Sequence, residues 1–209
     1  MRPFYFFCIS VVKVISRAIF RIRVRGRDNI PSEGAVILAS NHISYYDPPL
    51  VGSFVKREVH FMAKKELFRN RLFGKLISSL NAHPVNRQGF DKKALEMAGG
   101  LLKEGKLLII FPEGTRAKEG RFLPPRPGIG MIAVTSEAPV VPVYIHGANR
   151  LKDCFLGKEK LAIIYGEPIP RGEIEKFGRE KEGYYGLAEE ILRRIGELKE
   201  GFLRSSVKA

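Results

Sequence analysis

The sequence predicts a single α/β domain in which helices cover both faces of a largely parallel or mixed central sheet. Its 209 residues are the length of one compact domain. Short apolar runs alternate with segments of helical spacing, which is typical of strands and helices that follow one another along the chain. We find no internal repeat, low-complexity tract or linker. We therefore divide the chain into an N-terminal amphipathic helical segment, 1–25, and one domain, 26–209.

The N-terminal segment predicts a helix that lies in a membrane interface. From Phe4 to Phe20 it is apolar and aromatic, but Lys13 and Arg17 leave no apolar stretch long enough to span a bilayer, and no cleavage site follows. At about 100° per residue, the basic and serine side chains share a wedge of about 140° that contains no acid. The residues expected at the lipid are Phe4, Phe6, Phe7, Ile9, Val12, Lys13, Arg17, Phe20 and Arg21. The alternative is that the wide apolar face packs on the protein's own core.

The remaining elements follow from the spacing of apolar residues and from turn signals. Because the chain alternates between the two kinds of element, we expect ligands to gather where parallel strands end. The expected strands are 35–40, 59–63, 107–111, 140–145 and 161–165, and the expected helices are 66–80, 90–103, 128–137 and 184–198.

The charge of the chain favours an anionic partner. Its 36 Lys and Arg residues exceed its 22 Asp and Glu residues, for a formal net charge of +14. Nucleic acid, anionic lipid, a phosphorylated substrate and an acidic carrier protein all fit this charge. Cys8 and Cys154 form no paired or clustered motif, so we expect neither a disulfide framework nor a metal site, and a reducing, cytoplasmic setting.

One polar segment directly follows the strand expected at 35–40. His42 and Asp47 are five positions apart, which places them about 140° apart on a helix and on opposite faces of a strand. Pro48 and Pro49 predict an irregular turn, after which a helix begins with Asp47 as its cap. Asp47 can then accept a hydrogen bond from one imidazole nitrogen and leave the other free to take a proton. A bare capping contact is the alternative.

A second polar segment, Phe-Pro-Glu-Gly-Thr-Arg, follows the strand expected at 107–111. Pro112 ends the strand and Gly114 permits a tight backbone, so that Glu113 and Arg116 are presented at the tip. A guanidinium can grip a phosphate through two hydrogen bonds, and a carboxylate can accept them from a glycerol hydroxyl. A solvated turn is the alternative for this segment taken alone.

Together, and in this order, the two segments resemble the blocks of the glycerolipid acyltransferase family, whose best-known members acylate lysophosphatidic acid. Asn41, His42 and Asp47 match the first block, and residues 111–116 match the second at every position. Pro84-Val-Asn-Arg87 and Val140-Val-Pro-Val143 are similar to two looser blocks. The resemblance covers roughly residues 30–150. The segment at Pro84 departs from the commonest form, so only Arg87 is carried over.

The resemblance implies that 26–209 is an acyltransferase domain with His42 as general base and Asp47 orienting the imidazole. The acceptor hydroxyl would attack an acyl thioester directly, with acyl-coenzyme A or acyl carrier protein as donor and no bound cofactor or metal. Arg87 and Arg116 would hold the phosphate of lysophosphatidic acid and Glu113 its glycerol. We assign Gly114 and Thr115 to the same substrate-binding loop.

These features predict transfer of a fatty acyl group to the sn-2 hydroxyl of 1-acylglycerol-3-phosphate at the cytoplasmic face of the cell membrane. The enzyme would be peripheral or monotopic, with anionic phospholipid as its surface and acyl carrier protein as a further possible partner. Glycerol-3-phosphate or another lysophospholipid is the alternative acceptor. A non-catalytic protein that binds nucleic acid is the remote alternative, because it would need neither polar segment and would gain nothing from the aromatic N-terminus.

Overall fold

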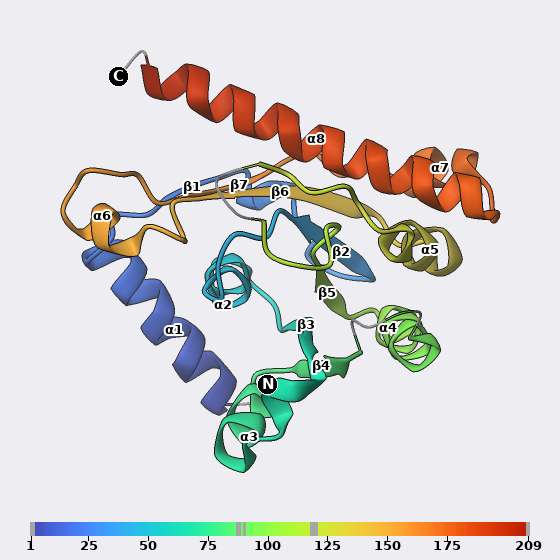
Figure 1. Ribbon diagram of the computed structural model, residues 1–209, viewed down its shortest axis with the longest axis horizontal. Coiled ribbons are helices and arrows are strands. Elements are labelled where there is room, and N and C mark those ends of the chain that lie inside the picture. The colour runs from blue at the N-terminus through green and yellow to red at the C-terminus, as the bar shows by residue number, and fades with distance from the viewer. Residues whose placement is uncertain (1–2, 87–88, 90, 118–120, 208–209) are drawn as a thin grey trace.

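A computed structural model describes residues 3–86, 89, 91–117 and 121–207, and it shows one mixed sheet of seven strands (Figure 1). The strand order is β1-β7-β6-β2-β5-β3-β4. All neighbouring strands pair in parallel except β6 and β7, so β1 and β7 run against the other five. The strands are β1 (Arg23–Arg25), β2 (Val36–Ser40), β3 (Val59–Lys64), β4 (Ala82–Val85), β5 (Leu107–Ile110), β6 (Val140–His146) and β7 (Ala162–Tyr165).

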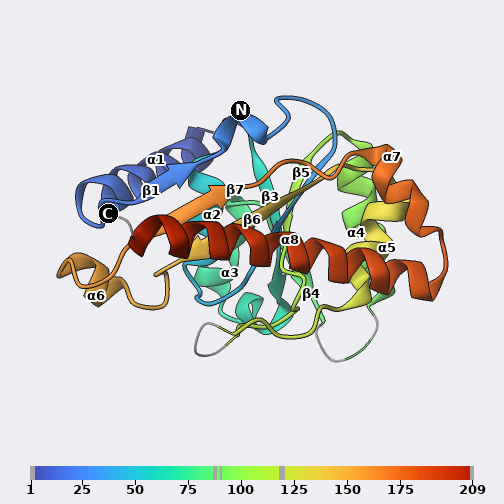
Figure 2. The same cartoon turned by 90° about the horizontal axis from the view of Figure 1, so that it is seen from above.

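Helices cover both faces of the sheet, as the sequence predicts. In Figures 1 and 2, α4, α5 and the long α8 lie on one face, and α1, α2, α3 and α6 lie on the other. The helices are α1 (Pro3–Ala18), α2 (Asp47–Ser53), α3 (Arg71–Ser79), α4 (Lys92–Lys103), α5 (Pro127–Ser136), α6 (Leu151–Phe155), α7 (Arg171–Ile174) and α8 (Lys181–Val207), with 3-10 turns at Arg27–Asn29, Lys65–Phe68 and Glu175–Phe177.

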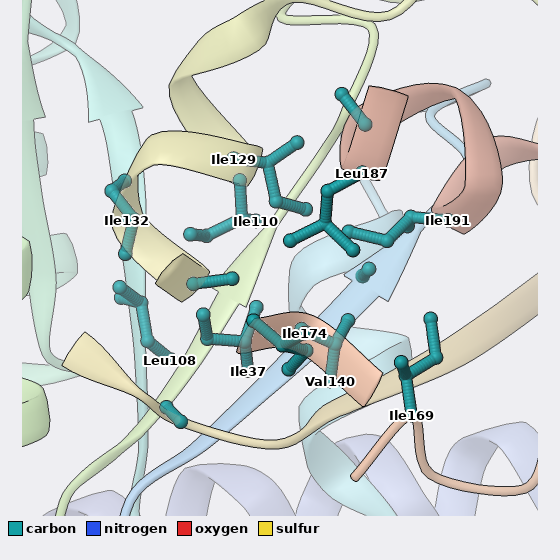
Figure 3. Close-up of a cluster of buried hydrophobic side chains, with 14 of the residues drawn as sticks. Ile37, Leu108, Ile110, Ile129, Ile132, Val140, Ile169, Ile174, Leu187 and Ile191 are labelled. Carbon is teal, nitrogen blue, oxygen red and sulfur yellow. The ribbon is translucent and has the colours of Figure 1, made fainter. Parts of the chain in front are cut away.

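The core consists of two layers because alternate residues of each strand point to opposite faces of the sheet. Ile37 of β2 and Leu108 and Ile110 of β5 pack with apolar residues of α5 and α8, as Figure 3 shows. The intervening Leu38 and Ile109 pack with α2 on the other face. Both central strands are therefore buried on both sides, which explains why their sequences are continuous apolar runs.

Several element boundaries differ from the prediction. The helix expected at 66–80 is a 3-10 turn, Lys65–Phe68, followed by α3, because Asn70 caps α3 by accepting a hydrogen bond from Phe73 N–H. The closing helix α8 extends beyond 184–198 at both ends. The strands β1 and β4 and the helices α6 and α7 were not predicted.

The N-terminal helix α1 lies on the sheet face that α2 also covers, and its two sides differ. Tyr5 is buried and its hydroxyl accepts a hydrogen bond from Val59 N–H, which ties α1 to the start of β3. Val12 and Phe20, which the sequence assigned to the lipid, are half-buried and pack against the core. Val12 lies on the same side of α1 as Tyr5, and Phe20 is in the turn that follows α1. The opposite side is exposed and apolar. Among the described residues, no helix combines the length and hydropathy needed to cross a bilayer.

Candidate active site

The two polar segments meet because the strands that precede them are neighbours. β2 pairs in parallel with β5, in a register that sets Ala39 beside Ile110. The two segments therefore leave the sheet side by side, at the carboxyl ends of their strands. Asn41 anchors the first segment: its side-chain amide donates to the carbonyl of Ile145 at 3.0 Å and accepts from Ile145 N–H at 2.8 Å. The start of the His42 loop is thus fixed to β6, the neighbour of β2 on its other side.

His42 and Asp47 form a buried pair in this loop. The distance from His42 Nδ1 to Asp47 Oδ2 is 2.7 Å, and Asp47 is 0% exposed. The same oxygen accepts hydrogen bonds from the backbone N–H groups of Ile43 and Ser44, each at 2.7 Å. A carboxylate in this position requires the proton on Nδ1, which leaves the lone pair of the imidazole on Nε2.

Asp47 begins a helix, as predicted, but it does not cap that helix. α2 starts at Asp47 with Pro48 and Pro49 in its first turn. The carboxylate is directed back to the N–H groups of the preceding loop instead of forward to those of α2. The backward turn is what brings Asp47 to the imidazole, and it corrects the predicted capping role.

Phe111 contacts His42 and is also one of the residues that line a large apolar cavity. It stacks on the imidazole with 4.0 Å between ring centroids and 21° between planes. Phe111 also lines a cavity of about 750 Å³ that extends beside β5, between α4, α5 and the start of α8. Met62, Leu95, Ile132 and Tyr184 line it further in. His42 itself is 5% exposed, so its ring lies in a site with little water.

Glu113 connects the two loops through backbone groups. Its Oε1 accepts a hydrogen bond from His42 N–H at 3.1 Å, and its Oε2 accepts one from Leu123 N–H at 2.8 Å. The carboxyl is 2% exposed, and burial raises its pKa, although the two N–H donors oppose that shift. The glycerol-binding role stays a prediction, and the linking role is one that the sequence did not reveal.

The rest of the second segment is more open. Arg116 and Thr115 are exposed, and the Arg116 guanidinium lies 3.5 Å from the centroid of the Tyr45 ring. Gly114 has a φ of 67°, and a Cβ there would come within 2.7 Å of Arg126 Cδ. Only glycine therefore allows this turn and the close approach of Arg126. Arg87 lies outside the described residues.

Comparisons with known proteins agree with this geometry. A family model described as Acyltransferase matches residues 21–146, more than half of the chain. The chain belongs to this acyltransferase family. The match includes both polar segments and the five strands that run parallel to one another, β2 to β6.

Individual members of the family cover more of the chain. The 1-acyl-sn-glycerol-3-phosphate acyltransferase of Bacillus subtilis is 32% identical over 195 residues, which span 93% of this chain and 96% of that protein. The protein of the same name from Streptococcus pneumoniae is 31% identical over 83% of this chain and 64% of its own length. The crystal structure of the 1-acyl-sn-glycerophosphate acyltransferase PlsC from Thermotoga maritima superposes with a TM-score of 0.69, at 29% identity, and covers 95% of this chain and 84% of that one.

Three contacts of the candidate site were not predicted from the sequence. Tyr45, Phe111 and Arg126 contact Arg116, His42 and Gly114, respectively, and all three lie in or beside the two motifs. Their contacts run between the loops, so no spacing along the chain signals them. Proximity to the motifs was the only available indication.

The described residues contain no group of three or more His, Cys, Asp or Glu side chains placed to hold a metal ion. The other histidines have partners of their own. His60 and His83 contact each other at 3.0 Å, and His146 lies between Tyr144 and Glu159.

Proposed function

We propose that this acyltransferase transfers a fatty acyl group from an acyl thioester to the sn-2 hydroxyl of 1-acylglycerol-3-phosphate, which yields phosphatidic acid. The observation that carries the proposal is the buried His42–Asp47 pair at a sheet edge, stacked on the ring that lines the apolar cavity. The names of the relatives from Bacillus subtilis and Streptococcus pneumoniae support this acceptor.

His42 acts as the general base in this reaction. Its Nε2 takes the proton of the acceptor hydroxyl, and the oxygen attacks the thioester carbon as the new C–O bond forms. The C–S bond then breaks, and the leaving thiolate takes the proton back from the imidazolium. Asp47 stabilises that imidazolium and holds the tautomer that the step needs. Because no acyl-enzyme forms, neither Cys8 nor Cys154 has a role.

The acceptor phosphate binds at the exposed end of the second segment. Stacking on Tyr45 uses the face of the Arg116 guanidinium and leaves its in-plane N–H groups for the phosphate oxygens. Arg87 is a second phosphate ligand by its motif. Thr115 and Gly114 shape the same turn. Glu113 acts chiefly by positioning the His42 loop, because backbone N–H groups already occupy both of its oxygens.

The apolar cavity takes a fatty acyl chain. Its volume is in the range of cavities that enclose drug-sized ligands, and Phe111, one of the residues that line it, also stacks on the base. An acyl chain bound here excludes water, which would otherwise compete with the acceptor hydroxyl for the thioester. The formal net charge of +14 attracts either donor carrier, coenzyme A or acyl carrier protein.

The reaction takes place at the cytoplasmic face of the cell membrane, where α1 lies in the interface as a peripheral or monotopic anchor. The exposed side of α1 is apolar and includes Phe4, Phe7 and Val14, and Arg17 and Arg21 are exposed near its C-terminal end. Such a helix buries its apolar side in the lipid and sets its bases against anionic head groups.

Transfer assays with the purified protein test the acyltransferase proposal. His42→Ala should lose nearly all turnover, and Asp47→Asn should lose about three orders of magnitude in kcat, because the wrong tautomer is then favoured. His83→Ala is the control, since His83 contacts His60 and lies outside the site. Lysophosphatidic acid, glycerol-3-phosphate and a lysophospholipid with a larger head group are compared as acceptors. Full turnover in His42→Ala, or a preference for either other acceptor, contradicts the proposal.

A further inference from the structure

One side of the molecule collects most of its large exposed apolar side chains, and they come from three helices far apart in the sequence. Five come from α1, three from α3 and one from α6, and two more, Ile19 and Leu156, directly follow α1 and α6. They are Phe4, Phe7, Val11, Val14 and Ile15 of α1 with the adjoining Ile19, Leu72, Phe73 and Leu76 of α3, and Phe155 of α6 with the adjoining Leu156. Figure 1 places these three helices along its lower left margin.

The three helices lie on the same face of the sheet. Cys154 of α6 belongs to the core layer that Val12 of α1 also packs against. Ile77 of α3 packs with Ala63 of β3 and with Phe61, which contacts that same layer. Their inner sides are thus accounted for by the core, and their outer sides face away from the sheet.

The opposite face provides an internal contrast. α8, which is 27 residues long, runs across this face, as Figures 1 and 2 show. Within its described side chains only Tyr185 and Leu203 are large, apolar and exposed. Its outer side instead carries ion pairs such as Arg193 with Glu190 and Glu197. Apolar exposure is therefore a property of one side of the protein and not of its helices in general.

The charges around the apolar side chains indicate what covers them. α1, α3 and α6 together contain one acid, Asp153, and it pairs with Arg150. Exposed bases accompany all three helices: Arg17 and Arg21, Arg69, Arg71 and Lys75, and Lys152 and Lys158. An apolar surface rimmed by bases matches an anionic bilayer, whose head groups meet the rim while the acyl chains meet the centre.

We propose that α3 and α6 join α1 in a single membrane-docking face, which rests on the proposed interfacial role of α1 and defines how the domain is oriented. One helix lying in the interface leaves the domain free to roll about the helix axis. A second and a third contact away from that axis remove this freedom.

The position of α3 links the docking face to catalysis, because α3 begins at the sheet edge that carries His42. β3 runs parallel to β2 and β5, and α3 begins seven residues after β3 ends, at the sheet edge that carries His42 and Phe111. Leu72 and Phe73 are in its first turn, and Leu72 is 84% exposed. When α3 enters the lipid, the catalytic edge is held near the surface from which an amphiphilic acceptor must come.

Tryptophan substitution tests the docking face directly, because the chain contains no tryptophan. Leu72→Trp, Phe155→Trp and Phe7→Trp report on α3, α6 and α1, and Leu203→Trp on α8 is the matched control. With vesicles of phosphatidylglycerol and phosphatidylcholine, the first three should shift their emission to the blue and be quenched by brominated acyl chains. Leu203→Trp should do neither.

The outcomes separate this inference from the proposal on which it rests. If Phe7→Trp responds and either Leu72→Trp or Phe155→Trp does not, the three-helix face is wrong and the role of α1 stands. If Phe7→Trp is also silent, the interfacial role of α1 fails as well. A blue shift of Leu72→Trp that grows with protein concentration in the absence of lipid would mean that a second copy of the chain covers α3, and it would overturn the inference.

A charge at the same position tests the consequence for catalysis. Leu72→Glu should bind vesicles about tenfold more weakly, since the transfer of one leucine side chain is lost. Activity on acceptor presented in vesicles should fall by a similar factor, and activity on a short-chain acceptor dissolved as monomer should not change. Leu203→Glu should change neither. An equal loss on both acceptors would indicate damage to the fold and contradict the docking role.

Discussion

The carboxylate of Glu113 holds the backbone N–H of His42, at 3.1 Å, and does not touch its ring. Through its other oxygen it holds Leu123, so that one buried side chain fixes the position of the catalytic loop against the segment that follows the second motif. The imidazole is therefore set from two directions, by Asp47 through its Nδ1 and by Glu113 through its main chain.

Replacement of Glu113 by glutamine should separate positioning from glycerol binding. Gln offers one acceptor oxygen where two N–H groups need one each, so one donor is left unpaired at a cost of about 1–3 kcal/mol in the free energy of unfolding. We expect kcat to fall between about tenfold and a hundredfold as the His42 loop shifts, with little change in the acceptor KM. Steady-state kinetics and chemical denaturation measure both effects, and Glu96→Gln on the exposed side of α4 is the control. A change confined to KM would favour the glycerol-binding role.

Removal of the Tyr45 ring should weaken acceptor binding through Arg116. The stacked guanidinium gains about 0.5–1 kcal/mol from the ring, so Tyr45→Ala should raise the acceptor KM about two- to fivefold with kcat unchanged. Tyr45→Phe keeps the ring face and should behave as wild type. Tyr46→Ala is the control, because it removes an exposed neighbour that does not stack on Arg116. If Tyr45→Phe were as impaired as Tyr45→Ala, the hydroxyl and not the stacking would be responsible.

A methyl group at Gly114 should disturb the site beyond its cost to the backbone. Gly114 and Gly34 both have a positive φ, 67° and 75°, and alanine at either should cost about 1–2 kcal/mol of stability. Nothing lies within 4 Å of a Cβ at Gly34, whereas at Gly114 it would push against Arg126. Gly114→Ala should thus lose activity that Gly34→Ala keeps, when both are assayed well below their melting temperatures. Equal activity in the two variants would show that the contact with Arg126 has no role.

The ion pairs of α8 predict that the free energy of unfolding decreases at acid pH. Hydrogen bonds from Arg193, followed by those from Arg194, lower the pKa of Glu190 to about 2, from an ordinary value of 4.5. A carboxyl with a depressed pKa stabilises the fold above about pH 4.5 and loses that contribution as the pH falls to about 2.

Glu190→Gln should accordingly lower the free energy of unfolding at pH 7 by about 1–2 kcal/mol, less than full linkage gives because the pair is partly exposed. Denaturation curves of the variant and the wild type should converge near pH 2. Glu200→Gln, whose pair with Arg204 is longer and largely exposed, should stay within about 0.5 kcal/mol at every pH. A gap between Glu190→Gln and wild type that persists unchanged at pH 2 would contradict the ionic origin.

Local signals in the sequence were sufficient for most of the fold. The apolar runs of β2 and β5 are buried on both faces, so no other element fits them, and the helices α4 and α5 begin within two residues of the prediction. The 3-10 turn before α3 was missed because Asn70 competes for the backbone, a cap that outweighs helical periodicity. The sequence could not show which part of the wide apolar arc of α1 packs on the core and which part is exposed.

The sequence by itself determined the family, the α/β class and the His42–Asp47 pair, because each depends on residues that are near one another along the chain. Only the tertiary structure decided that Glu113 holds the His42 loop, that Phe111 stacks on the base and also lines a cavity, and that α1, α3 and α6 share one apolar side. The physical reason is that these relationships join segments about 50 to 150 residues apart. Strand order and register bring such segments together, and no local pattern encodes them.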